Sequence, residues 1–538
     1  MLNSLRLFIL ILFVPKLLSA QFLPTEGEQV NYRIIGFSYP QEKNTAKKYK
    51  LEFAAGNYSS DSLFNLGIFK TEVCYKSTSI LELPYFDKEY TWRVVYYNKN
   101  GSQSKSKLQH FSTGYFRGID TCNIRLKILK PAVKYKDDYV FIDGSNVLYD
   151  MKGNPVWYLP MQKREDKSNA QIRDLKTSPQ GTITFMLNQH AYEMNYNGDT
   201  LWRGPDDGAV NGEDSERYHH EMTRMSNGHY MILGTEHVFW DHVVKPVDSS
   251  FSVDGDEPKP LGTTPAQRKK TPFGTIIEYD EKGKVVWSWK SSGYFMNSDV
   301  VNFMPEGMSK VIDVHENAFF FDEKDSVIYL SFRNISRILK IKYPEGNIVN
   351  TYGEIFKPGI PPSGNGLFCD QHGIRRSKEG HLYLYNNNAC NDATALPTIL
   401  IMDEDKGGKD SLTKIWEYQC NIEGINVSPL LKKAWAKKQL LRQTQKELKS
   451  LKGSLLHVTT GGNVIEMPDK SIFACMNAQY GKIFIVTRDK KILWEAIPEK
   501  YNQGDDQWYI TSNQYRASII TPKELHRLIY NSMNVRNQ

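Results

Sequence analysis

Three histidines occupy comparable places in a repeated pattern, each shortly before or at the start of an apolar run. They are His220 in HHEMTRMSNGHYMIL, His315 in HENAFFFDEKDSVIYLSF and His372 in QHGIRRSKEGHLYLY. If each run is the first strand of a hairpin, and the hairpins belong to small sheets around one axis, the three imidazoles converge at one end of that axis. Neutral imidazole is a nucleophile and a general base near neutral pH.

Arg333 adds a cation to this predicted cluster. Counting outward from the turn of the hairpin that begins at His315 sets Arg333 within about a residue of the position opposite Val314. A guanidinium beside three imidazoles suits a tetrahedral oxyanion and disfavours a metal cation, although a metal site built from three histidines remains an alternative. The same counting places Asn386–Asn388 near His372 as polar lining.

The other histidines form no matching set. His219 is expected to point away from His220, because successive side chains alternate along a strand. The rest are expected to be structural: His110, His190, His229, His237, His242, His381, His457 and His526.

The elements that would position this cluster repeat along the chain. One hairpin type carries Trp or another bulky residue on its second strand, and its six copies are Val147–Tyr158, Tyr192–Trp202, Ile276–Trp289, Ile338–Tyr352, Ile399–Tyr418 and Ile483–Trp494. A second type lies between them: Ile172–Leu187, Met222–Leu233, Ala318–Phe332, Gly373–Tyr385 and Val464–Met476. A four-stranded sheet buries both faces only against neighbours, so we predict a six-bladed β-propeller over residues 118–538.

The region before the repeats, residues 21–117, has short alternating runs such as Tyr90–Tyr97 (YTWRVVYY), followed by a polar turn. This pattern predicts an antiparallel β-sandwich. Its end resembles a fibronectin type III domain. The whole chain is therefore predicted to be all-β.

The N-terminus predicts export from the cytoplasm. Arg6 precedes the apolar run Leu7–Val14, and Leu18-Ser19-Ala20 is typical of a cleavage site, so residues 1–20 are expected to be a signal peptide. The protein is then periplasmic or secreted. Six cysteines without a CxxC pair argue against a cysteine zinc site and allow disulfides, whose pairing the sequence leaves open.

Charge and hydropathy exclude some partners. The net charge of +7 comes from 68 basic and 61 acidic groups, which is no nucleic-acid footprint. No later run is long enough to span a bilayer. Trp240–Pro272 is polar and is predicted to be a surface loop. Residues 428–452 carry eight basic groups against Glu447 alone and predict a helix, either a solvated one or one that attaches to an acidic partner or membrane surface.

These motifs resemble the bacterial arylsulfate sulfotransferases that do not use the nucleotide sulfate donor. The resemblance rests on HHEMTRMSNGHYMILG, DVHENAFFFDEKDSVIYLSFRN and DQHGIRRSKEGHLYLYNNN, with support from IIEYDEKGKVVWSW and QYRASII. It covers nearly all of the chain after residue 20. It implies an N-terminal sandwich joined to a six-bladed propeller.

The resemblance also implies roles for the clustered residues. His372 would be the nucleophile that becomes transiently sulfated, and His220, His315 and Arg333 would hold the sulfuryl oxygens. The reaction would be a ping-pong transfer from aryl sulfates to small phenols, without an organic cofactor. Some members of the family have a short-range disulfide near the site, which here corresponds to Cys369–Cys390.

The chain departs from the family pattern at several turns and at residues 457–462 (HVTTGG), where a Ser/Gly-rich strand is expected. Two rival functions stay open: a non-catalytic propeller that binds oxyanions or sulfated ligands, and a metal-dependent hydrolase or lyase that uses the three histidines. The sequence also leaves open the physiological donor and acceptor, and the oligomeric state, a homodimer included.

Overall fold

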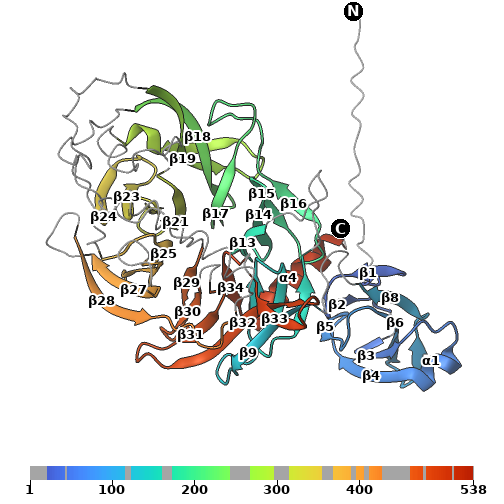
Figure 1. Ribbon diagram of the computed structural model, residues 1–538. Helices are drawn as coiled ribbons and strands as arrows, with labels where there is room; N and C mark the ends of the chain where they lie inside the picture. The colour runs from blue at the N-terminus through green and yellow to red at the C-terminus, as the bar shows by residue number, and fades with distance from the viewer. Residues whose placement is uncertain are drawn as a thin grey trace, which may run out of the picture. The chain divides into compact units, whose positions relative to one another are not determined.

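The computed structural model describes twelve stretches of the chain: 21–42, 45–114, 123–159, 172–242, 267–295, 314–353, 367–388, 396–404, 411–426, 461–476, 480–511 and 514–536. The chain divides into two compact units. Unit 1 is Met1–Gly114 with Ile529–Gln538, and unit 2 is Tyr115–Leu528. The described residues form many strands and little helix, as the prediction of an all-β chain requires (Figure 1). The predicted signal peptide (1–20) and basic helix (428–452) lie outside the described residues.

Unit 1 contains two sheets. Its elements are β1 (Glu28–Val30), β2 (Ile34–Ser38), β3 (Thr45–Ala55), α1 (Asp61–Gly67), β4 (Ile68–Cys74), β5 (Thr78–Glu82), β6 (Lys88–Asn98), β7 (Gln103–Lys105) and β8 (Gln109–Thr113). The larger sheet has the order β1-β8-β6-β3-β4, with β7 on β6, and β2 pairs with β5. The ring of Phe37 in β2 lies 5.0 Å from both Phe53 in β3 and Trp92 in β6. Aromatic contacts therefore pack the two sheets together.

Unit 2 is a succession of small antiparallel sheets in chain order (Figure 1). The first strands are β9 (Ile124–Lys130), β10 (Tyr139–Ile142), β11 (Val147–Asp150) and β12 (Pro155–Tyr158). The second sheet has β13 (Ile172–Thr177), β14 (Ile183–Leu187), β15 (His190–Met194) and β16 (Thr200–Arg203), and the third has β17 (Tyr218–Arg224), β18 (Tyr230–His242), β19 (Gln267–Tyr279) and β20 (Val285–Lys290), followed by the short 3-10 helix η1 (Ser291–Gly293). The fourth has β21 (Glu316–Asp322), β22 (Val327–Phe332), β23 (Arg337–Lys342) and β24 (Ile348–Gly353).

The fifth sheet has β25 (His372–Arg376), β26 (Leu382–Asn386), β27 (Thr398–Glu404) and β28 (Leu412–Gln419). The sixth has β29 (Asn463–Glu466), β30 (Ile472–Cys475), β31 (Ile483–Val486), β32 (Ile492–Asn502) and β33 (Gln507–Ile510), with β9 paired to β32. The last strand, β34 (Ala517–Ile520), pairs with β10, so both ends of unit 2 build the first sheet. Helix α4 (Pro522–Arg536) follows it.

Local turn chemistry explains why the Trp-bearing hairpins recur. In DMKGN the Asp150 carboxylate accepts the N–H groups of Lys152 and Asn154, and Gly153 takes a φ of 89°. The same Asx-x-x-Gly turn occurs at Asp280, where Gly283 has a φ of 82°. An Asx side chain that bonds its own turn, followed by glycine at positive φ, favours a tight hairpin over a helix.

The tryptophans of these hairpins connect neighbouring sheets. The indole N–H of Trp157 donates to the Tyr196 carbonyl of the second sheet over 2.7 Å, and Trp416 of the fifth sheet donates to the Arg488 carbonyl of the sixth over 2.7 Å. Trp494 of the sixth sheet donates over 3.1 Å to Met151 of the first. Each indole thus satisfies its polar N–H on the following hairpin turn, and the rings of Trp157 and Trp494 are fully buried.

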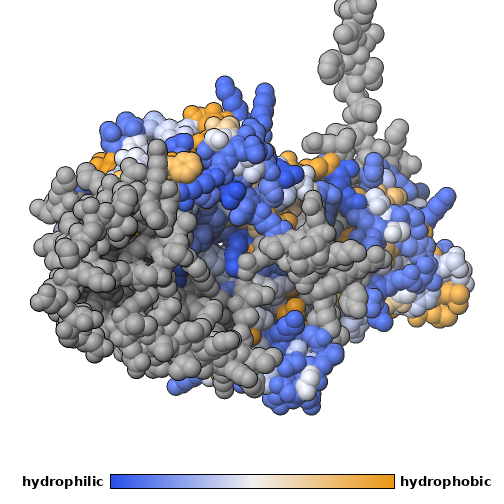
Figure 2. Space-filling view, turned by 45° about the horizontal axis from the view of Figure 1, so that its top comes forward, coloured by the Kyte–Doolittle hydropathy of each residue, from blue (hydrophilic) through white to orange (hydrophobic). Residues whose placement is uncertain are grey.

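Two surface features complete the description. The predicted loop Trp240–Pro272 is partly wrong, because β18 and β19 pair as far as His242 and Gln267, and only residues 243–266 lie outside the described residues. The ladder of β18 and β19 continues through the polar residues QRKKT, because pairing satisfies the backbone groups of both strands whatever side chains they carry. Hydrophilic residues cover most of the described surface on the face in Figure 2. Among the described residues, no helix is long and apolar enough to cross a membrane.

Candidate active site

The four residues singled out from the sequence lie close together in unit 2. His220 lies in β17, His315 directly precedes β21, and His372 is the first residue of β25. The ring centroids of His220 and His315 are 4.9 Å apart. Arg333 follows β22, and its main-chain N–H donates to the His315 carbonyl over 2.9 Å, within one residue of the position that hairpin counting gave.

Irregular first strands place these side chains. The pairing register shifts within β13, β17, β21 and β25 alike. Near each shift a residue has left-handed backbone angles: Asp174 (φ 56°), His220 (φ 62°), His315 (φ 60°) and Gly373 (φ 62°). A bulge bends a strand and re-aims its side chains, and a non-glycine residue at positive φ costs about 1 kcal/mol or more. Strain at His220 and His315 is typical of residues held for function.

Hydrogen bonds define the state of the His372 ring. Nδ1 lies 2.7 Å from the Asn387 side-chain oxygen, and Asn387 is oriented because its own amide donates to the Gly461 carbonyl. The main-chain N–H of Gly461 donates to Nε2 of His372 over 3.2 Å. An oxygen acceptor at Nδ1 and an N–H donor at Nε2 require the proton on Nδ1. His372 is therefore neutral, with its lone pair on Nε2.

The same reasoning applies to His220, and it corrects the expectation for His219. His219 does not point away: its Nδ1 lies 2.6 Å from Nδ1 of His220, and the bulge at His220 explains why the alternation fails. Nε2 of His219 is 2.9 Å from the Gly234 carbonyl, so it carries the proton of that ring. Nδ1 of His219 must then accept from His220, which leaves the lone pair of His220 on Nε2.

The pKa values agree with neutral rings. Burial lowers the pKa of His372 far below its usual value near 6.5, and the charge of Arg333 lowers it further. Burial also lowers the pKa of His220 strongly, with further contributions from His219 and His315. These imidazoles therefore stay unprotonated across the neutral range.

Tyr515 completes the cluster, and sequence reasoning assigned it no role although it lies in the quoted motif QYRASII. Its ring centroid is 5.6 Å from that of His220 and 6.0 Å from that of His372. The side chain is buried, and its hydroxyl has no hydrogen-bond partner among the described residues. Burial raises its pKa to about 12, although Arg516 and Arg173 oppose the rise. Tyr515 is therefore a neutral hydroxyl within the cluster.

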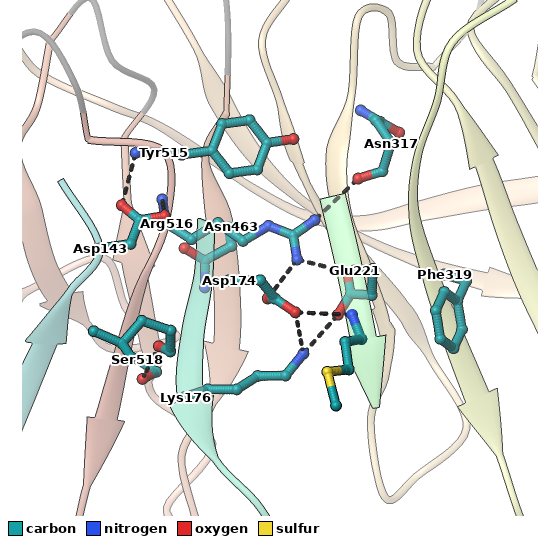
Figure 3. A network of polar contacts seen from close by, with 12 residues as sticks. Asp143, Asp174, Lys176, Glu221, Asn317, Phe319, Asn463, Tyr515, Arg516 and Ser518 are labelled. Atoms are coloured by element: carbon teal, nitrogen blue, oxygen red, sulfur yellow. Dashed lines mark hydrogen bonds and ion pairs between the residues drawn. The ribbon is translucent and has the colours of Figure 1, made fainter. Parts of the chain in front are cut away.

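A buried ion network lies beside the histidines (Figure 3). The Arg516 guanidinium donates to Asp174 over 2.7 Å and to Glu221 over 2.6 Å. Lys176 bridges the same two carboxylates, and Arg375 adds a contact of 2.8 Å to Glu221. These residues come from different sheets, so the network links the first, second, third and fifth sheets of unit 2.

Several other histidines pair with carboxylates away from the cluster. His229 lies 2.7 Å from Glu278, and His237 lies 3.2 Å from Glu213. Such pairs match the structural role expected for them. His457 lies outside the described residues.

Among the described residues, Cys74, Cys420 and Cys475 are free and buried, whereas Cys369 is disulfide-bonded. The Asn388 main-chain N–H donates to the Cys369 carbonyl over 3.2 Å, as the predicted approach of these strands requires. Cys390 lies outside the described residues, so the Cys369–Cys390 bond stays a prediction. No group of three or more His, Cys, Asp or Glu side chains that could hold a metal ion occurs in the described part of the chain.

Comparison with known proteins gives one family. The model of the family described as Arylsulfotransferase (ASST) matches residues 130–254 and 261–424, which together make up more than half of the chain and include His220, His315, Arg333 and His372. A curated relative, elongation factor Ts of Buchnera aphidicola subsp. Cinara cedri, is 31% identical over 153 residues, which are 26% of this chain and 52% of that protein. The chain thus spans about half the length of that relative.

Solved structures give weaker likenesses. A protein of unknown function from Bacteroides caccae is 11% identical, with a TM-score of 0.37 over 67% of this chain and 93% of that one. An auxiliary nutrient binding protein from Bacteroides thetaiotaomicron is 9% identical, with a TM-score of 0.31 over 93% of this chain and 99% of that one. Neither likeness supports an argument about this chain.

Proposed function

The chain belongs to the arylsulfotransferase family, and we propose that it moves a sulfuryl group from an aryl sulfate to a phenol through a covalent sulfo-histidine at His372. Membership of the family supports aryl sulfotransferase activity in general. The observation that carries the finer proposal is the hydrogen bonding of His372: Asn387 holds Nδ1–H, and the lone pair is directed from Nε2. A buried, neutral and oriented imidazole is a competent nucleophile.

The proposed fold of unit 2 is a six-bladed β-propeller that follows an N-terminal β-sandwich. The pairing of β34 with β10 and the contact of Trp494 with Met151 support it, because both join the last part of the unit to the first. The proposed domain limits remain 21–117 and 118–538. Export by the predicted signal peptide, to the periplasm or the outside of the cell, is likewise a proposal.

In the first half of the reaction, Nε2 of His372 attacks the sulfur of the aryl sulfate. The N–S bond forms, the bond from sulfur to the aryl oxygen breaks, and the phenolate leaves. The Asn387 oxygen then stabilises the positive charge that the sulfated ring acquires, through Nδ1–H.

In the second half, the acceptor phenol attacks the same sulfur and the N–S bond breaks. The acceptor gives its proton to Nε2 of His220, whose lone pair is available, and His220 passes that proton on to the released phenolate or to solvent, which restores the neutral ring. One aryl sulfate and one phenol thus become the other phenol and the other aryl sulfate.

The charge that develops on the sulfuryl oxygens needs fixed donors. Arg333 and His315 supply them in this proposal, because Arg333 acts electrostatically on His372 and its main chain is bonded to His315. Gly461 supplies another: its N–H loses its acceptor when Nε2 bonds to sulfur and then donates to a sulfuryl oxygen. By analogy with phosphoryl transfer, positioned donors of this kind carry most of the catalysis.

The test is nitrophenol release from nitrophenyl sulfate, with and without phenol and without any nucleotide donor. Release should depend on phenol and disappear in His372→Asn, while His381→Asn, whose ring lies 3.3 Å from Asp403 in the same sheet, should behave as wild type. Donor without acceptor should leave one sulfuryl group on a peptide that contains His372. Release independent of phenol would indicate a sulfatase, and no release would favour an oxyanion-binding protein.

A further inference from the structure

Asp143 is a buried carboxylate that the proposed chemistry does not use. It directly follows β10 and is 1% exposed. One of its oxygens accepts the main-chain N–H of Tyr515 over 2.9 Å, and the other accepts that of Arg516 over 2.8 Å. Its own N–H donates to the Arg516 carbonyl over 3.3 Å. Figure 3 shows the carboxylate directly beside the segment that carries both residues.

This segment reaches the nucleophile on one side. The Tyr515 carbonyl accepts the N–H of Gly462 over 2.9 Å, and the preceding residue, Gly461, donates to Nε2 of His372. Gly461 has a φ of 88°, and a Cβ at this position would lie 2.4 Å from the Tyr515 carbonyl oxygen. Tyr515 and Gly461 are in close contact, and Gly461 bonds His372. A shift of Tyr515 therefore also shifts Gly461.

On its other side the segment reaches His220. The Tyr515 ring lies 5.6 Å from the His220 ring, and the Arg516 side chain is bonded to Glu221, the next residue in β17. A single carboxylate therefore holds the main-chain segment that lies against both His220 and His372.

We propose that Asp143 is a positioning residue for sulfuryl transfer, and that the transfer slows when its carboxylate becomes protonated. The inference rests on the proposed function. In the ionised carboxylate both oxygens accept an N–H group equally well. In the protonated carboxyl one oxygen carries the proton, so only the other remains a full acceptor. Protonation therefore weakens the hold on Tyr515 or Arg516 without removing any group that contacts the substrate.

The surroundings of Asp143 bring this change into the neutral range. Burial raises its pKa to about 7, against the charges of Arg173 in β13 and Arg516 and the two N–H bonds. The Cys475 thiol of β30 also interacts with it, and Tyr515 contacts it through the main-chain N–H. Since the pKa values of His220 and His372 are far lower, an acid limb near pH 7 in the rate profile comes from Asp143 rather than from the nucleophile.

The experiment measures kcat and KM for nitrophenyl sulfate and phenol from about pH 5.5 to about pH 9. This range extends about 1.5 to 2 pH units on either side of the pKa of Asp143. Wild type should lose activity as the pH falls through about 7. Asp143→Asn keeps one acceptor oxygen at every pH, so its kcat should be about 10- to 100-fold lower at pH 8, with KM nearly unchanged and the limb near pH 7 absent. Asp143→Glu should recover part of the rate and the limb.

Asp138 provides a matched control at the other end of β10. Burial raises its pKa too, to about 6, but it contacts neither Tyr515 nor Arg516 in the hydrogen bonds of the described residues. Asp138→Asn should keep the wild-type limb. Circular dichroism and thermal unfolding should show that both variants are folded.

The outcomes separate the two proposals. A folded Asp143→Asn that keeps the wild-type kcat and limb overturns the positioning role and leaves the transferase intact. A wild-type protein without transfer activity at any pH overturns the proposed function and the inference together. If Asp143→Asn does not fold, the test uses Asp143→Glu instead. A rate profile of Asp143→Glu whose acid limb lies at the same pH as that of wild type also overturns the inference.

Discussion

His220 and Glu221 are neighbours in β17, yet their side chains belong to two polar clusters of different character. Glu221 lies in the ion network, where Arg516, Lys176 and Arg375 surround it. Burial would raise its pKa, but these cations hold it well below the usual range. His220 lies in the histidine cluster, where burial and neighbouring groups keep the ring neutral. The strand β17 thus carries the ionised Glu221, which is paired with cations, next to the uncharged base His220.

The difference shows how a buried site can be both stable and reactive. In the network each carboxylate bonds at least two cations, so removing a central cation leaves buried carboxylates with less compensation. In the histidine cluster the rings are neutral and the Tyr515 hydroxyl has no partner among the described residues, so a ligand can supply the missing negative charge and acceptors. We therefore expect network variants to lose stability and cluster variants to lose activity.

The largest effect is expected in the network. Arg516→Met should lower the free energy of unfolding by about 3–5 kcal/mol, because it leaves Asp174 and Glu221 with fewer cations in a buried site. Denaturant unfolding measures this loss. Arg217→Met is the control, since its pair with Glu213 is 3.5 Å long and its side chain is 44% exposed, and it should cost less than about 1 kcal/mol. Equal losses in both variants would contradict the comparison.

In the histidine cluster, Arg333→Gln should lower kcat about 100- to 1000-fold, the usual effect of removing a donor to a developing oxyanion. Its free energy of unfolding should change far less than that of Arg516→Met. Steady-state kinetics with aryl sulfate and phenol, together with denaturant unfolding, measure the two effects. An Arg333 variant that is strongly destabilised but retains its kcat would place Arg333 in the structural group.

A smaller effect is expected where the orientation of the nucleophile changes. Asn387→Ala removes the acceptor of the His372 Nδ1–H, and kcat should fall about 10- to 100-fold, as when the outer partner of an oriented histidine is lost. The control is Asn350→Ala, in which the lost amide contacts Tyr352 within β24, at the edge of the fourth sheet, whereas His372 and Asn387 belong to the fifth. A burst of nitrophenol in rapid mixing should slow with Asn387→Ala and not with the control.

The smallest effect concerns stability and pH. The folded-state pKa values of His220 and His372 lie below 6.5, so the unfolded chain binds more protons at acid pH and stability falls as the pH drops below that value. Each histidine should cost about 1 kcal/mol between pH 7 and 5.5. Thermal unfolding of His220→Asn against wild type should show a smaller acid loss in the variant. A wild-type curve that matches the variant at every pH would exclude neutral burial of this ring.

Asp143 acts in the opposite direction. Its pKa is raised to about 7, so the folded protein binds a proton that the unfolded chain has released, and this contribution to stability is lost as the pH rises from about 4 to 7. Asp143 therefore differs from His220 and His372 in the sign of its linkage.

The sequence by itself determined the features that arise from local periodicity. The spacing of His220, His315 and His372 before strand runs, and the count that sets Arg333 opposite the start of its hairpin, follow from two-residue alternation and short turns. The same counting placed Asn386–Asn388 near His372, where Asn387 bonds the ring. These features need only a few neighbouring residues, so one sequence is enough to read them.

Only the tertiary structure decided how the side chains turn and what holds them. The bulge at His220 brings His219 to the same side, although strict alternation predicts the reverse. Asp143 and Tyr515 are 372 residues apart in the chain and meet because β34 closes the first sheet. Such a contact has no period and no local turn signal, since it depends on how the two ends of unit 2 come together. Its strength comes from burial, which the sequence does not specify residue by residue.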